Sequence, residues 1–439
     1  MVFAVSLDGG ISNSTQRFFI LYITRGGAEL AARFTATLLT FVAFATALLY
    51  GLGSAISWAV LSLTNVPLEL QPDASYLLTH IGLLIGLILF SNILLGYLRA
   101  INRFRTIAVA TIVAQLGYVV AIILSADHLT VRGMFALALV QLGLLNVLLA
   151  LDCAPHLIRV RLRFLPWPEV RDVYSYAWRA QIMNLSALAI LQTDALFVAA
   201  ILPIEQLGYL AIAGQAASGI RSLPTFALSP LISQITRRFG EAGLASATSL
   251  ASLQNRRWVL LVSTYSVVTV TTIGLAVRGW TGDYRMVEVA ATILALGNAV
   301  NLITGVATAY CRSIGRPGIE ARYGLVLVIG NLALSFPCTY FGGLIGAVSS
   351  TAVVQLTGVI YFNRVLRRAI PTFDLGLSQI RTSRLILVAA CSLALALLSL
   401  LLPAKSLTAL AVVVAATAVP VLVYILIVRR KASGLVYDG

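Results

Sequence analysis

The sequence is poor in charged side chains, above all in acidic ones. Only 11% of its 439 residues are charged, with 16 acidic against 31 basic residues, while 59% are hydrophobic. A water-soluble protein needs far more polar side chain than this to cover its surface. Apolar runs of the length that crosses a bilayer follow one another along the chain, so the sequence predicts an all-α, polytopic membrane protein.

The residue types that build catalytic and metal sites are equally scarce. The four cysteines are isolated, and no CxxC or Cys/His spacing suggests a metal or redox site. The three histidines, His80, His128 and His156, stand singly near the ends of apolar runs. The short connections hold no pair of acidic residues suited to acid–base chemistry. We therefore expect no enzyme activity, no catalytic residue, no metal site and no cofactor, with proton or sodium coupling left open.

The basic residues are spread over the ends of the apolar runs and form no single aromatic-rich basic face, which argues against nucleic-acid binding. Their distribution alternates from one connection to the next. Connections such as 97–105 and 153–172 are rich in arginine, whereas the intervening ones hold acids such as Glu69 and Asp73. The positive-inside rule then predicts that the arginine-rich connections and the C-terminus are cytoplasmic. We expect a multi-pass protein of the inner (cytoplasmic) membrane.

The apolar runs between these charged connections predict about thirteen transmembrane segments. Their expected ranges are 1–23, 34–63, 76–98, 104–124, 132–152, 173–201, 207–236, 258–277, 286–310, 323–340, 344–363, 384–402 and 406–428.

Two stretches of the sequence occur twice. YLRAINR at 97–103 returns as YCRSIGR at 310–316, and ISNSTQRF at 11–18 returns as ISQITRRF at 232–239. The echoes predict two pseudo-symmetric lobes of like orientation, a recurrent plan for transporters that work by alternating access. The expected divisions are an N-terminal lobe (1–152), a basic cytoplasmic linker (153–172), a C-terminal lobe (173–368) and an appended transmembrane hairpin (382–428).

The second echo also places Met1 opposite Ser222, in the middle of a predicted helix. We therefore expect the N-terminal lobe to lack the counterpart of the first helix and of half of the second.

The stretch 191–239 resembles the seventh and eighth helices of polysaccharide-biosynthesis transporters. The resemblance lies in the turn IEQLGYLAIA and the helix end SPLISQITRRF, and the Gly-Arg-Pro turn of YCRSIGRPGIEARYGLVLVIGNLAL is similar too. That family includes the O-antigen and lipid-linked oligosaccharide flippases of the multidrug/oligosaccharidyl-lipid/polysaccharide exporter superfamily.

The resemblance implies a flippase that moves an undecaprenyl-diphosphate-linked oligosaccharide from the inner to the outer leaflet by alternating access. Its cargo would be a repeat unit of O-antigen, capsule or exopolysaccharide. The lipid bilayer surrounds it, and the polysaccharide polymerase and glycosyltransferases of the same pathway become candidate partners.

Such a substrate needs cations for its diphosphate and amides or hydroxyls for its sugars. Arg221, inside the segment 207–236 and three residues before Pro224, is the first candidate, and Arg17 is the second. An equal alternative is that Arg221 reaches a lipid headgroup or pairs structurally. Amides and hydroxyls recur at helical spacing, either to line a sugar cavity or to bond neighbouring helices; they are Gln181, Asn184, Gln192, Gln215 and Ser218.

Asp194 lies well inside an apolar run, where carboxylates are rare. It could take up a proton or cation for coupling, hold Arg221 in the unloaded state, or bond a neighbouring helix. Two other functions stay open: an ion-coupled multidrug or cation extruder of the same superfamily, and a membrane-embedded glycosyltransferase or polymerase. The first would be expected to carry more acidic cavity residues, and the second needs catalytic groups in longer outward loops.

Overall fold

The computed structural model describes residues 11–379, apart from 64–67, 158–162, 226 and 283. Over this part the chain is helical and contains no strand, which confirms an all-α polytopic membrane protein. Seven of the described helices are long and apolar enough to cross a membrane, or up to eight if the bent pair α10 and α11 forms one span. The count of about thirteen segments stays a prediction, and the hairpin expected at 382–428 lies outside the described residues.

The helices form two compact units. The first holds Met1–Asn184 and Ile232–Gly243, and the second holds Leu185–Leu231 and Leu244–Gly439. Two long helices, α7 (Trp167–Ile201) and α9 (Leu228–Thr281), contribute to both units. The lobe boundaries expected from the sequence repeat stay a prediction.

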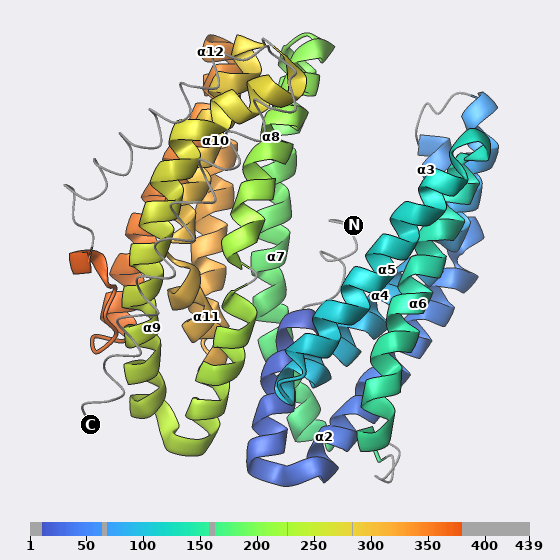
Figure 1. The fold of residues 1–439 in the computed structure, drawn as a ribbon, viewed down its shortest axis with the longest axis vertical. Helices are drawn as coiled ribbons and strands as arrows, with labels where there is room; N and C mark the ends of the chain where they lie inside the picture. Colours follow the sequence, from blue (N-terminus) through green and yellow to red (C-terminus); the bar gives the residue numbers. More distant parts are fainter. Residues whose placement is uncertain (1–10, 64–67, 158–162, 226, 283, 380–439) are drawn as a thin grey trace. The chain divides into compact units, whose positions relative to one another are not determined.

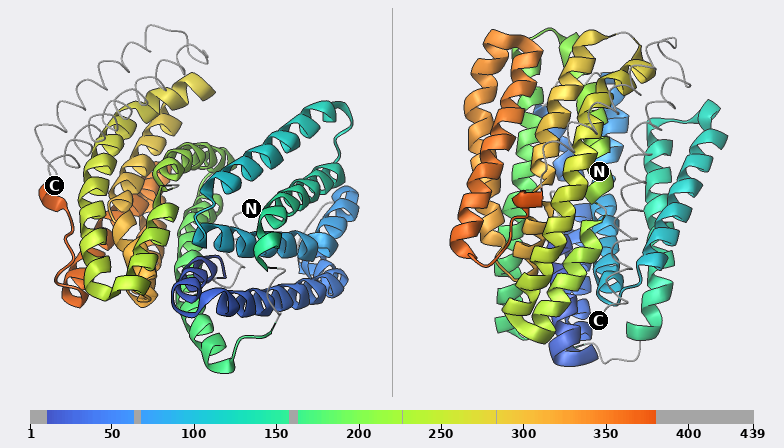
Figure 2. Two further views of the ribbon diagram at one scale, coloured as in Figure 1. Left: turned by 60° about the horizontal axis from the view of Figure 1, so that its bottom comes forward. Right: turned by 60° about the vertical axis from the view of Figure 1, so that its left-hand side comes forward.

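The first unit is built mainly of α2 to α6 (Figure 1). Its helices are α2 (Ile11–Gly51), α3 (Gly53–Leu63), α4 (Gln71–Ala100), α5 (Phe104–Leu124) and α6 (Val131–Leu157), with short 3-10 turns at η1 (Leu68–Leu70) and η2 (Ala126–His128). The views in Figure 2 show α5 and α6 side by side, and α2 packs along α4. The segments predicted at 76–98, 104–124 and 132–152 are confirmed as α4, α5 and α6.

The predicted segment 34–63 is divided between α2 and α3 at a pair of glycines. Gly51 ends α2 and Gly53 begins α3. A Cβ atom on Gly53 would lie 2.2 Å from the carbonyl oxygen of Thr79, so only glycine allows α3 to approach α4 this closely.

The second unit combines the later parts of α7 and α9 with four further helices (Figure 1). These are α8 (Ile204–Thr225), α10 (Arg285–Leu302), α11 (Gly305–Ser313) and α12 (Pro317–Ala369), followed by the 3-10 turn η3 (Leu377–Gln379).

Helix α12 contains the two segments predicted at 323–340 and 344–363. Gly343 separates its two legs with φ 58°, a left-handed conformation that favours glycine. A hydrogen bond from Asn331 to Thr351 shows that the second leg folds back along the first.

The predicted segment 207–236 is not one helix. Helix α8 ends at Thr225, directly after Pro224, and α9 begins at Leu228. Proline lacks a backbone N–H and clashes with the preceding turn, so it commonly ends or kinks a helix. The piece of α9 from Ile232 to Gly243 packs in the first unit, and Gly243, with φ 77°, separates it from the rest of α9.

The two copies of the repeated turn share one backbone conformation. In each, the residue before the last arginine of the repeat has positive φ, 63° at Asn102 and 81° at Gly315. A backbone hydrogen bond of 2.8 Å then closes each turn over the end of the preceding helix, as in a Schellman motif. These bonds run from Arg103 N to Leu98 O and from Arg316 N to Cys311 O.

Candidate functional site

A buried polar cluster surrounds Asp194 in the second unit. The carboxylate of Asp194 accepts hydrogen bonds from the hydroxyl of Ser335, at 2.8 Å, and from that of Thr351. Ser335 and Thr351 lie on the two legs of α12, so Asp194 joins α7 to both legs. The amide of Asn331 donates to Thr351 at 2.9 Å, and the hydroxyls of Ser335 and Ser350 are 3.0 Å apart.

All five side chains of this cluster are nearly inaccessible. Asp194 is 6% exposed, Ser335 and Asn331 are 0% exposed. A carboxylate at this depth is unfavourable unless it is protonated or paired with a cation. Within the part of the chain that the structure describes, no basic side chain forms an ion pair with Asp194. The carboxylate, hydroxyl and amide oxygens together form a donor set that suits a proton or a small hard cation such as sodium.

The contacts of Asp194 in this structure bear on two of the roles expected for it, and its role in transport stays a prediction. The residue does bond a neighbouring helix, α12. It does not pair with Arg221, although the structure describes both side chains.

Arg221 lies about 25 Å along α8 from its start at Ile204, given 1.5 Å per residue. It lines a small cavity of about 10 Å³ within the second unit, which is space for about one water molecule. Tyr265 and Thr269 from α9 and Asn298 from α10 line the same cavity. The guanidinium of Arg221 forms no hydrogen bond or ion pair with the described residues. A cation, hydroxyls and an amide thus line one cavity, with no acidic side chain among the described residues that line it.

The other expected binding residues differ in their surroundings. In the first unit, Gln181 is buried and accepts a hydrogen bond of 3.3 Å from Asn184. Also in the first unit, the guanidinium carbon of Arg17 lies 4.9 Å from the ring centre of Tyr176. The remaining three are exposed in the second unit and share no hydrogen bond with Arg221 among the described residues; they are Gln192, Gln215 and Ser218.

Some cluster residues carried little sequence signal. Asn331 belongs to this cluster through its hydrogen bonds with Thr351 and Ser335. Ser335, four residues later on the same helical face, could have been found from that spacing. Thr351 and Ser350 could not, because hydroxyls are frequent in membrane helices and often bond only to their own backbone.

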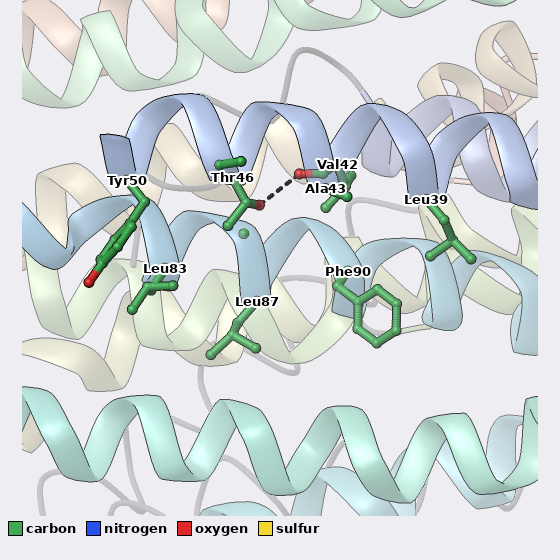
Figure 3. A pocket seen from close by; sticks show the side chains of 10 residues that line it. Leu39, Val42, Ala43, Thr46, Tyr50, Leu83, Leu87 and Phe90 are labelled. Carbon is green, nitrogen blue, oxygen red and sulfur yellow. Dashed lines mark hydrogen bonds between the residues drawn. The ribbon is translucent and has the colours of Figure 1, made fainter. Parts of the chain in front are cut away.

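An apolar groove of about 550 Å³ lies between α2 and α4 in the first unit (Figure 3). Its lining residues are Leu39, Val42, Ala43, Thr46, Ala47, Tyr50, Leu83, Gly86, Leu87 and Phe90. The hydroxyl of Thr46 donates a hydrogen bond of 2.7 Å to the carbonyl of Val42, so its donor is already satisfied and the lining of the groove stays largely apolar. Both walls belong to candidate membrane spans, Glu29–Gly51 and Gln71–Ala100. The groove can therefore accept an apolar chain. It was missed in the sequence because its residues look like ordinary lipid-facing positions.

Residues 27–254, more than half of the chain, match the sequence profile of a family described as "Polysaccharide biosynthesis protein". The chain belongs to this polysaccharide biosynthesis family. No curated protein gives a significant sequence match.

Solved structures show that this member of the polysaccharide biosynthesis family has the fold of MATE transporters of the MOP superfamily. It resembles VcmN, a MATE transporter from Vibrio cholerae in its bent form, with a TM-score of 0.68 and 12% identity over 85% of this chain and 88% of that one. The MATE transporter ClbM in complex with Rb+ gives a TM-score of 0.64 and 14% identity over 86% of this chain and 87% of that one. A MOP superfamily transporter from Pyrococcus furiosus, described as having a binding pocket of reverse polarity, gives a TM-score of 0.62 and 14% identity over 84% of this chain and 85% of that one.

Proposed function

We propose that this protein is a transporter that flips a polyprenyl-diphosphate-linked oligosaccharide across the cytoplasmic membrane, from the inner to the outer leaflet, by alternating access. The family and the fold support a transporter of the polysaccharide-exporting branch of the superfamily. The observation that carries the choice of substrate is Arg221. It is a cation beside hydroxyl and amide groups with no acidic partner among the described residues.

Arginine suits a diphosphate because its planar guanidinium offers two parallel N–H donors to phosphate oxygens. The cavity beside Arg221 now has room for about one water molecule. Diphosphate binding there therefore requires α8 to separate from α9 and α10. A conformational change of this kind belongs to alternating access, in which the binding site opens to one side of the membrane at a time.

The apolar groove between α2 and α4 supports the proposal that the substrate carries a lipid chain (Figure 3). Its apolar lining, which includes the small residues Ala43 and Ala47, lies at membrane depth and suits a hydrocarbon chain.

The Asp194 cluster supports coupling to an ion. Binding of sodium or a proton would neutralise the buried carboxylate, and its release would leave a charge that favours a different packing of α7 against α12. An Asp194→Asn variant keeps the size of the side chain and removes the charge. Flipping should then lose its dependence on a sodium or proton gradient.

The alternative of a multidrug or cation extruder keeps one supporting observation, the structural likeness to MATE transporters. It predicts a carboxylate in the substrate cavity, whereas the cavity beside Arg221 is lined by no acidic residue within the described part of the chain. The fold gives no support to the glycosyltransferase or polymerase alternative.

The test is flipping of a fluorescent undecaprenyl-diphosphate oligosaccharide in proteoliposomes. Arg221→Gln should reduce the rate at least about tenfold, since one charge-assisted hydrogen bond is worth about 1.5–3 kcal/mol. Arg221→Lys should keep part of the rate. Arg171→Gln, which removes an exposed arginine from α7, is the matched control and should be neutral. Unchanged flipping by Arg221→Gln, or export of cationic dyes in place of the lipid, would refute the proposal.

A further inference from the structure

The two repeated turns share a backbone but differ in how their first arginine is paired. In the second unit, Arg312 donates from Nε and Nη2 to the two carboxylate oxygens of Glu320, at 2.7 and 2.5 Å. The side chain of Glu320 is only 3% exposed. The charge of Arg312 is therefore neutralised within the turn.

Arg99 is the counterpart of Arg312 in the first unit, and it has no such acid. The position that corresponds to Glu320 is Ile107, an apolar side chain packed against the core of the unit. The guanidinium of Arg99 is partly buried and makes no hydrogen bond or ion pair with the described residues. Because the two turns have the same backbone hydrogen bonds, the difference comes from the missing acid and not from the turn geometry.

The other charges near this turn leave it strongly positive. Nη1 of Arg103 lies 3.9 Å from Oδ1 of Asp152, and both side chains are partly exposed. Arg237 reaches the turn from α9, where its Nη2 donates to the carbonyl of Ala100 at 2.8 Å and its Nη1 to the side-chain oxygen of Asn102 at 2.8 Å. These acceptors are neutral, so the charge of Arg237 stays uncompensated there.

We propose that Arg99 binds a phosphate group carried by a lipid. Arg99 lies one residue before the end of α4, on the side of the membrane that the charge rule makes cytoplasmic. Lipid phosphates lie at the ends of spanning helices, and the guanidinium fork matches their oxygens. The phosphate is either the diphosphate of the lipid-linked substrate before it moves to Arg221 or the headgroup of an anionic phospholipid. Only the first source rests on the proposed function.

The repeat itself suggests the sharpest variant. Ile107→Glu places an acid where Glu320 stands in the other turn, so that Arg99 gains an internal partner and releases the lipid. Ile107→Gln has nearly the same size and polarity without the charge, and it serves as the control. Arg99→Gln removes the cation directly.

The experiment measures lipid binding to the purified full chain by native mass spectrometry. The probes are undecaprenyl diphosphate, phosphatidylglycerol and the phosphate-free alcohol undecaprenol. Ile107→Glu and Arg99→Gln should each weaken binding of a phosphate-bearing probe about tenfold, while Ile107→Gln and undecaprenol binding stay unchanged. An effect confined to undecaprenyl diphosphate identifies the substrate as the source, and an effect on both phosphate probes identifies a general headgroup site. Equal binding by wild type, Arg99→Gln and Ile107→Glu overturns the proposal.

A second measurement uses the wild-type protein and so does not depend on the folding of variants. Phenylglyoxal modifies accessible arginines, and the modified residues can be mapped by mass spectrometry. The bound phosphate-bearing probe should protect Arg99 and leave the exposed Arg105 reactive. Protection of neither residue would refute the site. Neither measurement requires transport, so loss of flipping with intact binding would refute the proposed function alone.

Discussion

The ion pair between Arg312 and Glu320 allows a quantitative test of what stabilises the second unit. Its two hydrogen bonds are short, the side chain of Glu320 is 3% exposed and that of Arg312 is 26% exposed. Removing one partner of a buried pair typically costs about 3–5 kcal/mol, because the other charge is left without compensation.

Replacing Arg312 and replacing Glu320 should therefore lower the free energy of unfolding by different amounts. Arg312→Gln leaves the nearly inaccessible carboxylate without a cation, and we expect a loss of about 4 kcal/mol in the free energy of unfolding. Glu320→Gln leaves an arginine that is about a quarter exposed and can reach water or headgroups, so about 2 kcal/mol is expected. The double variant buries no charge at this place and should lose only about 3 kcal/mol, which gives a coupling energy of about 3 kcal/mol.

The assay is equilibrium unfolding of the four proteins in one lipid–detergent mixture, analysed as a double-mutant cycle. Arg322→Gln, an exposed arginine ten residues along the chain from Arg312, is the control and should change stability by less than about 0.5 kcal/mol. Single effects that add to the double effect within about 0.5 kcal/mol would refute the reasoning, because they would mean that the two charges do not interact.

Two further predictions concern the bend of α12 at Gly343 and the residues that follow this helix. Gly346→Ala would place a Cβ 1.8 Å from the carbonyl oxygen of Cys338, so it should destabilise the protein by several kcal/mol in the same unfolding assay, whereas Gly342→Ala meets no atom within 4 Å and should be well tolerated. After α12, a backbone N–H and Arg256 both donate to Asp374 and lower the pKa of its carboxyl below the ordinary value. The resulting stabilisation should be complete above about pH 4 and lost as the pH falls through the depressed pKa. Hydrogen exchange of residues 370–376, corrected for intrinsic rates, should show this loss, and Asp374→Asn should show no such pH dependence.

Much of the helical layout could be predicted because bilayer crossing imposes length and hydropathy on each helix. The range 104–124 is that of α5, and the range 76–98 lies within α4 (Gln71–Ala100), since an arginine-rich turn separates the two helices. The predicted segment 207–236 is divided between α8 and α9 for a local reason. Its apolar residues run through Pro224, and average hydropathy does not register where a proline ends a helix.

The candidate sites were predictable only where a side chain is unusual for a membrane helix. Arg221 and Asp194 are charged residues in apolar runs, so each could be singled out. The hydrogen-bond partners of Asp194 could not be predicted in this way. Asp194 was open to pairing with Arg221, and it instead bonds hydroxyls on two legs of α12 that are ordinary membrane residues in the sequence.

The sequence by itself determined the class of the protein, the alternation of charge from which an orientation is predicted, and the repeat that marks two related turns. These properties depend on composition and spacing, which the bilayer constrains directly. Only the tertiary structure decided that Arg312 is neutralised by Glu320, whereas no described residue pairs with the Arg99 guanidinium, and that Ser335 and Thr351 bond the Asp194 carboxylate. The physical reason is that a charge in a membrane protein is stabilised or exposed by the few side chains within hydrogen-bonding distance. Which side chains those are depends on how the helices pack.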